Sequence, residues 1–141
     1  MLHSDTELAA LLRQVKTIAV VGAKDKPGQP VDRVGRYLIE AGFTVIPVHP
    51  KRPTVWGLKT YPTLADVPVP IDLVDLFRAA EACPDHAREA LALVSPPRAF
   101  WMQSGISSAE AQDILKDSDI RVVEDRCLMV DHARLIKGGG R

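Results

Sequence analysis

The fold is decided by the stretch TIAVVGAKDKPGQPVDRVGRYLIEAGFTVIPVHPK, residues Thr17–Lys51. It contains two apolar segments, Ile18–Val21 and Phe43–Val48, and the first of them ends at Gly22. Pro30 suits the first turn of a helix between them. A buried strand that turns at a glycine into a helix opens a nucleotide-binding βαβ unit, and the unpaired N–H groups at the helix start suit a phosphate. The stretch therefore predicts a site for a phosphate-bearing ligand.

Size and composition fit one α/β domain. The chain has 141 residues, of which 46% are hydrophobic and only 5% aromatic. Such a composition is typical of a parallel sheet of small aliphatic residues that is covered by helices. The formal net charge is zero, so no overall field attracts DNA or an anionic membrane. We expect a small-molecule nucleotide ligand, with no nucleic-acid and no membrane partner.

The cysteines and the termini indicate an ordinary cytoplasmic protein. Cys83 and Cys127 form no CxxC motif, which favours two reduced, buried thiols over a metal site. The first residues carry no signal-peptide pattern, and no apolar run reaches membrane-spanning length. Residues 137–141, KGGGR, predict a flexible tail.

Apolar segments and helical patterns alternate along the chain. Ser4 and Glu7 form a capping-box pattern at the start of an amphipathic helix over residues 5–16, which we expect to pack on the domain. Ser107 and Glu110 form a second such pattern. Right-handed crossovers then give a single-domain, Rossmann-like, doubly wound parallel sheet of about five strands over residues 17–136, with helices on both faces. The later expected elements are strands at Ile71–Phe77, Arg98–Met102 and Ile120–Val123, a helix from Pro84, and one helical turn at Leu64–Asp66.

Two residues in this pattern need a packing explanation. Gly35 lies inside the expected helix that follows Pro30, where it predicts close packing of the helix on a strand. Trp56 lies in the proline-rich connection His49–Pro70 and is expected to pack that connection.

The end of the second strand narrows the ligand. A dinucleotide fingerprint has the form GxGxxG, whereas Gly22 and Gly28 are separated by AKDKP. An NAD site places Asp or Glu near the end of this strand, but the chain continues with His49, Pro50, Lys51 and Arg52. A basic pair fits a phosphate on the ribose, unless it is a solvated turn. The residues alone leave NADP and coenzyme A as alternatives.

The sequence resembles the small coenzyme A-binding proteins with a Rossmann-like fold, which are similar to the N-terminal domain of the succinyl-CoA synthetase alpha subunit. The resemblance extends over about Thr17 to Ile136. Family members commonly have Ser in place of Lys24 and Asn in place of His49. The matching motifs are IAVVGAKDKPG (18–28), RVGRYLIEAGFTVIPVHPK (33–51), YPTLADVP (61–68), DLVDLFR (72–78), WMQSGI (101–106) and VVEDRC (122–127).

The resemblance implies a coenzyme A site. In it, Gly22, Ala23 and Lys24 approach the pyrophosphate, while Pro47, Val48 and His49 lie beside the adenosine. Lys51 contacts the ribose phosphate, and Phe77 and Arg78 flank the nucleotide or the pantetheine. From the residues themselves, Arg33 lies within a turn of the helix start and Gln103 follows a strand end, so both are added as candidates.

The sequence and this resemblance together favour a protein that binds coenzyme A or an acyl-CoA without catalysis of its own. A cysteine near a histidine can act as a nucleophile pair, but Cys127 is expected to be a buried thiol, so no catalytic residue and no metal ligand are predicted. The alternatives are a small NADP-dependent oxidoreductase and a nucleotide-sensing regulatory module.

Overall fold

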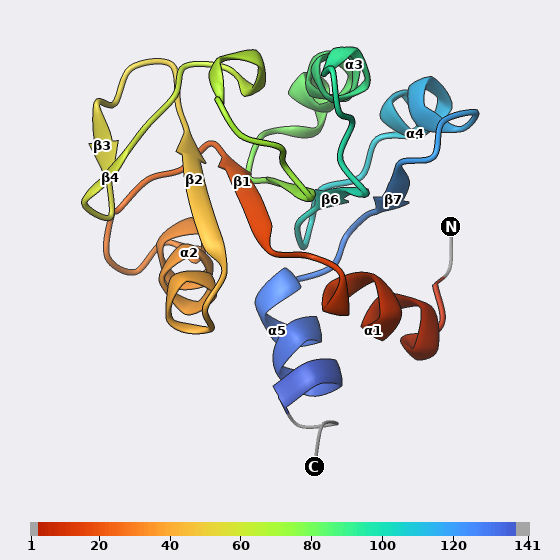
Figure 1. Cartoon of the computed structure of the whole chain (residues 1–141), viewed down its shortest axis with the longest axis horizontal. Helices are drawn as coiled ribbons and strands as arrows, with labels where there is room; N and C mark the ends of the chain where they lie inside the picture. The colour runs from red at the N-terminus through yellow and green to blue at the C-terminus, as the bar shows by residue number, and fades with distance from the viewer. Residues whose placement is uncertain (1–2, 138–141) are drawn as a thin grey trace.

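The computed structural model describes residues 3–137 and contains a five-stranded parallel sheet (Figure 1). The strand order is β2-β1-β5-β6-β7, so the chain reverses its direction across the sheet between β1 and β5. This confirms the predicted α/β fold with a Rossmann-like parallel sheet. The strands are β1 (Thr17–Val21), β2 (Thr44–Val48), β5 (Leu73–Leu76), β6 (Ala99–Met102) and β7 (Arg121–Val123).

Helices cover both faces of the sheet (Figure 1). Alternate residues of β1 pack into two separate cores, Ile18 and Val20 into one and Ala19 and Val21 into the other. Burial on both faces explains why the strands are continuously apolar. One layer contains α1 (Asp5–Arg13), α2 (Pro30–Glu40) and α5 (Leu128–His132), and the other contains α3 (Cys83–Ala92) and α4 (Ala109–Leu115).

One of the two predicted capping boxes is confirmed. The Glu7 N–H donates to Ser4 Oγ at 3.1 Å, and the Ser4 N–H donates to Glu7 Oε1 at 3.2 Å. The prediction for α4 is wrong by one residue, because Ser108 is the N-cap and its hydroxyl accepts from the Ala111 N–H at 3.1 Å. The Ser108 N–H donates to Glu124 Oε1 at 3.3 Å, a long-range bond that the local pattern does not contain.

The proline-rich connection contains a short hairpin that was not predicted. Strands β3 (Thr54–Val55) and β4 (Leu58–Lys59) pair antiparallel around Trp56. A Cβ at Gly35 would lie 2.1 Å from the Trp56 ring, and Trp56 Nε1 donates to Asp32 Oδ1 at 2.9 Å. Gly35 therefore makes room for Trp56 rather than for a strand, and the hairpin is fixed to α2.

The remaining short elements differ in how well they were predicted. The turn Leu64–Asp66 is a 3-10 helix (η1), as predicted, and a second one (η2) spans Ala80–Ala82. Helix α5 was not predicted, and it continues in a wider helical turn, Ala133–Lys137. Lys137 thus belongs to this turn, whereas residues 138–141 of the predicted tail lie outside the described part of the chain.

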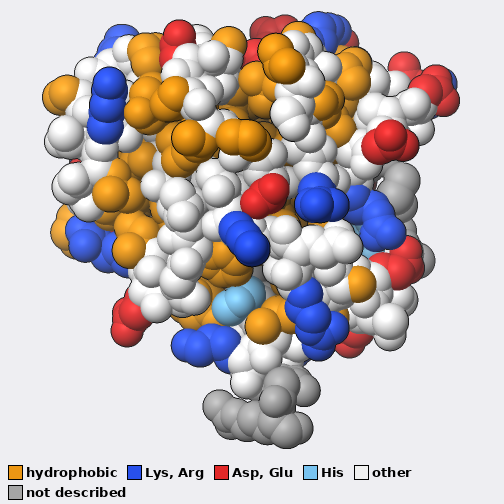
Figure 2. Space-filling view, in the orientation of Figure 1, with side chains coloured by type: hydrophobic (Ala, Val, Ile, Leu, Met, Phe, Trp, Pro, Cys, Tyr) orange, Lys and Arg blue, Asp and Glu red, His pale blue; other side chains and the backbone are white. Residues whose placement is uncertain are grey.

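Apolar side chains gather on the face shown in Figure 2, over η1 and α3. Val94 is fully exposed, and Val69 and Leu91 are 46% and 42% exposed. Val69 and Val94 border a shallow groove of about 290 Å³ between Leu64–Ile71 and Leu93–Ser95, whose lining carries no charge. Among residues 3–137, no helix combines the length and apolar character needed to cross a membrane.

Candidate functional site

The carboxyl ends of β1, β2 and β5 meet at Gly22. Its N–H donates to the Val48 carbonyl at 3.0 Å, and its φ of +83° is one that L side chains rarely adopt. A Cβ at this position would lie 2.5 Å from the Phe77 carbonyl oxygen. Glycine is therefore required where the strand order switches, which is where open α/β sheets bind their ligands.

A cleft of about 530 Å³ opens beside Gly22. Its volume falls in the range of small-molecule sites. Its walls come from the ends of β1, β5 and β6, from the first turn of α2 and from the residue before α5. The predicted site residues Gly22, Lys24, Arg33, Phe77, Arg78 and Gln103 line it, together with Gln29, Pro30, Val31, Val34, Ala79, Ser104, Ile106 and Cys127.

A smaller pocket of about 170 Å³ shares Gly22 and Arg78 with this cleft. It also contains Val48, a predicted residue, and the pair His86 and Glu89 from α3, in which His86 Nδ1 lies 2.6 Å from Glu89 Oε1. This pair was not predicted, because it lies within an amphipathic helix whose sequence pattern contains no motif for a binding site. The two cavities together flank the switch point.

Four predicted site residues line neither cavity. The side chains of Ala23 and Pro47 are buried in the protein, so only their main-chain atoms are left to approach a ligand. His49 is half-buried and Lys51 is exposed just beyond β2. Their predicted contacts remain predictions.

Positive charge is concentrated around the ends of β1, β2 and β5. The pKa of His49 lies below its usual value, first because of burial and then because of the charges of Arg52, Lys24, Arg78 and Lys51. Within residues 3–137, no carboxylate forms an ion pair with Lys24, Arg33, Lys51 or Arg78. Uncompensated cations at one place favour a polyanionic ligand.

The turn after β2 is held by hydrogen bonds on both sides. His49 Nδ1 accepts from the N–H groups of Lys51 and Arg52 at 3.0 and 3.3 Å. The Arg52 guanidinium donates to Asp25 Oδ1 at 3.2 Å, which connects this turn to the loop after β1. Asp25 Oδ2 also accepts from the Trp56 N–H at 3.3 Å, so one carboxylate joins the loop, the turn and the hairpin.

The far end of the cleft differs from the sequence-based expectation. Cys127 was expected to be buried, but it is half-exposed and lines the cleft. Gln103 is only 4% exposed, and its Oε1 accepts from the Leu128 N–H at 3.1 Å, so it connects β6 to the start of α5. These positions depend on α5, which the sequence did not predict.

A buried carboxyl lies beneath the cleft. Asp75 pairs in register with Val20 and Trp101, each of which is two residues before a cleft residue. It is 0% exposed, and both of its oxygens lack a hydrogen-bond partner among the described residues. Burial raises the pKa of Asp75 well above its usual value, because the charged form would lose its hydration, and this favours the neutral acid in the folded protein.

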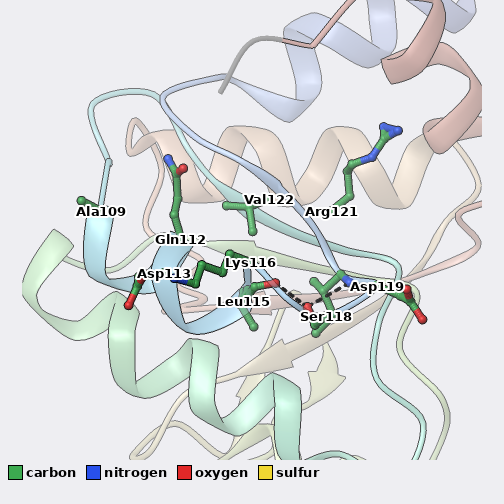
Figure 3. A pocket seen from close by; sticks show the side chains of 10 residues that line it. Ala109, Gln112, Asp113, Leu115, Lys116, Ser118, Asp119, Arg121 and Val122 are labelled. Atoms are coloured by element: carbon green, nitrogen blue, oxygen red, sulfur yellow. Dashed lines mark hydrogen bonds and ion pairs between the residues drawn. The ribbon is translucent and has the colours of Figure 1, made fainter.

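A second cavity of about 500 Å³ lies at the outer edge of the sheet, between α4 and β7 (Figure 3). Its charges are mixed, and both lining cations have a carboxylate partner: Lys116 pairs with Asp113 at 3.0 Å, and Arg121 reaches Glu7 of α1 at 3.4 Å. Among the residues that the structure describes, no group of three or more His, Cys, Asp or Glu side chains is placed to hold a metal ion.

Comparisons with known proteins agree with this geometry. The model of the family described as CoA binding domain matches residues 16–133. The chain belongs to this CoA-binding domain family. It is 36% identical over 130 residues to YneT, an uncharacterized protein of Bacillus subtilis. The matched region covers 92% of this chain and 95% of YneT.

Solved structures give the same fold. A Thermus thermophilus protein, cell-free ID.343, is 45% identical, with a TM-score of 0.88 over 95% of this chain and all of that one. A dinucleotide-forming acetyl-coenzyme A synthetase 1 of Ca. Korarchaeum cryptofilum shares the fold at 23% identity and a TM-score of 0.68, over 82% of this chain and 28% of that one. The resemblance to small CoA-binding proteins is therefore confirmed.

Proposed function

We propose that this protein binds coenzyme A, free or acylated, along the carboxyl ends of its strands. The observation that carries the proposal is a group of cations around the switch point of a CoA-binding family fold that form no ion pair within residues 3–137, namely Lys24, Arg33, Lys51 and Arg78. Coenzyme A carries three phosphate groups, and charge-assisted hydrogen bonds to such groups are the strong ones.

The strand order supports one direction for the ligand. Lys51 follows β2, Gly22 follows β1, Arg78 follows β5 and Gln103 follows β6, so these groups lie along the sheet in that order. Three interstrand spacings give a path of roughly 15 Å. The ribose phosphate would lie at the Lys51 end. The pyrophosphate would lie at Gly22 and the first turn of α2, and the pantetheine between Val34, Ile106 and Cys127.

A binding role without chemistry of its own is part of the proposal. Within the described residues, Cys127 makes no side-chain hydrogen bond to a histidine or a carboxylate, so no general base is paired with this thiol. We infer the cytoplasm as the compartment of such a coenzyme A-binding protein.

Calorimetry with coenzyme A, dephospho-coenzyme A and NADP tests the proposal. We expect Lys51→Ala to weaken coenzyme A binding about tenfold and to leave dephospho-coenzyme A nearly unchanged, because a charged hydrogen bond contributes about 1.5–3 kcal/mol. Lys116→Ala, at the edge cavity, is the matched control. Tight binding of NADP with none of coenzyme A would reject the proposal and favour an oxidoreductase.

A further inference from the structure

We propose that His49 is a positioning residue, whose Nδ1 holds the Lys51–Arg52 turn in the form that makes the site selective for a phosphate on the ribose. The inference rests on the proposed function and adds to it the group that shapes the selective end of the site. The contacts that carry it are two hydrogen bonds to one ring nitrogen.

The first step concerns the ring itself. His49 Nδ1 accepts from the N–H groups of Lys51 and Arg52 at 3.0 and 3.3 Å, so it carries no proton and the neutral ring has its proton on Nε2. An imidazolium ring would donate from both nitrogens and would lose both contacts. Burial and the nearby charges of Arg52, Lys24, Arg78 and Lys51 lower the pKa of His49, which keeps the accepting form populated at neutral pH.

The second step concerns what the ring holds in place. The main chain of His49 is fixed independently, because its N–H donates to the Tyr61 carbonyl at 3.0 Å and Val48 pairs with Tyr61. Arg52 is held from the other side by Asp25. Lys51 lies between these anchors, exposed and without an ion pair among the described residues. The turn is thus rigid at its backbone while its lysine stays free for a ligand.

The third step identifies a side chain that can replace the accepting nitrogen of His49. A side chain that caps N–H groups two and three residues further on needs an acceptor one bond beyond Cγ. Asn Oδ1 occupies that position, whereas Leu fills a similar volume with a methyl group that accepts nothing. The pair His49→Asn and His49→Leu therefore separates the acceptor from the bulk of the side chain.

The test is the ratio of the affinities for coenzyme A and dephospho-coenzyme A in the wild-type protein and both variants. We expect His49→Leu to lower this ratio on the order of tenfold through weaker coenzyme A binding, with dephospho-coenzyme A nearly unchanged. His49→Asn should keep the ratio within about threefold of the wild-type value. An unchanged ratio in His49→Leu, or equal losses in both variants, would overturn the proposal.

Nitrogen-15 NMR of the unliganded protein tests the same contact without a ligand. We expect the His49 ring to be protonated at Nε2 only, and the Lys51 and Arg52 amides to exchange faster in His49→Leu than in His49→Asn. A proton on Nδ1 at neutral pH would overturn the proposal. If the wild-type protein binds no coenzyme A, the proposed function fails instead, and the two failures are distinguishable.

Discussion

Two cavities of nearly equal size lie at different places on the same sheet. The switch-point cleft has a volume of about 530 Å³ and the edge cavity between α4 and β7 about 500 Å³. In the edge cavity, Lys116 and Arg121 are paired with carboxylates. In the cleft, Lys24, Arg33 and Arg78 have no such partner among residues 3–137.

This difference shows that volume alone does not identify a binding site. Exposed ion pairs contribute little to stability, but they place a carboxylate beside each cation of the edge cavity, so among the described residues that cavity offers no unpaired positive charge to an anionic ligand. The cations of the cleft, which lack a carboxylate partner among residues 3–137, repel one another, and a bound polyanion offsets that repulsion. The following changes test this distinction, from the largest effect on binding to the smallest.

Reversal of one charge in each cavity gives the largest contrast. Arg78→Glu should weaken coenzyme A binding on the order of 100-fold, because it removes one charged contact and adds repulsion. Lys116→Glu changes the net charge by the same amount and should alter the affinity less than about twofold. Calorimetry at two salt concentrations measures both. Equal losses would mean that net charge, rather than the cleft, attracts the ligand.

The sequence was sufficient to predict the features that depend on a local pattern of residues, namely the central strands and the residues at their ends. Continuous apolar segments locate the central strands, and their carboxyl ends locate Gly22 and Arg78, because a parallel sheet brings those ends to one edge. The same logic led to Lys51, which the structure places exposed beyond β2.

Long-range packing determines the parts that were not predicted. Pro47 is buried and pairs in register with Val20 of the neighbouring strand. The sequence pattern alone does not predict this register. Cys127 reaches the cleft because α5 packs against β6 through Gln103. The hairpin around Trp56 depends on the space that Gly35 leaves in α2.

Gly22→Ala tests the geometry of the cleft apart from its charge. The Cβ would lie 2.5 Å from the Phe77 carbonyl oxygen, at a φ of +83°. Gly42→Ala is the matched control, because Gly42 has a φ of +100° and open space around it. We expect Gly42→Ala to cost about 1–2 kcal/mol in urea unfolding for its backbone alone. Gly22→Ala should cost at least about 1 kcal/mol more in the free energy of unfolding. It should also weaken coenzyme A binding about tenfold. Equal losses of stability in the two variants, with unchanged coenzyme A binding, would mean that Gly22 is not part of the binding site.

Asp75→Asn should have the smallest effect on binding and a distinct effect on stability. The raised pKa of Asp75 means that the folded state keeps its proton to a higher pH than the unfolded chain. The stability that the neutral acid contributes is complete below about pH 4 and is lost as the pH rises through the folded pKa, at up to about 1.4 kcal/mol per pH unit. Asn does not ionise, so its advantage over the wild-type residue should grow by about 1 kcal/mol or more between pH 5 and pH 8.

Asp113→Asn, on the exposed wall of the edge cavity, is the control for this change and should show no such growth. Coenzyme A affinity should stay within about twofold in Asp75→Asn, because a side chain with 0% exposure does not line the cleft. A stability difference that is constant with pH would mean that Asp75 is not a neutral acid in the folded protein. A large loss of affinity would mean that the cleft extends down to this carboxyl when the ligand is bound. The cleft would then differ from the edge cavity in its depth as well as in its charge.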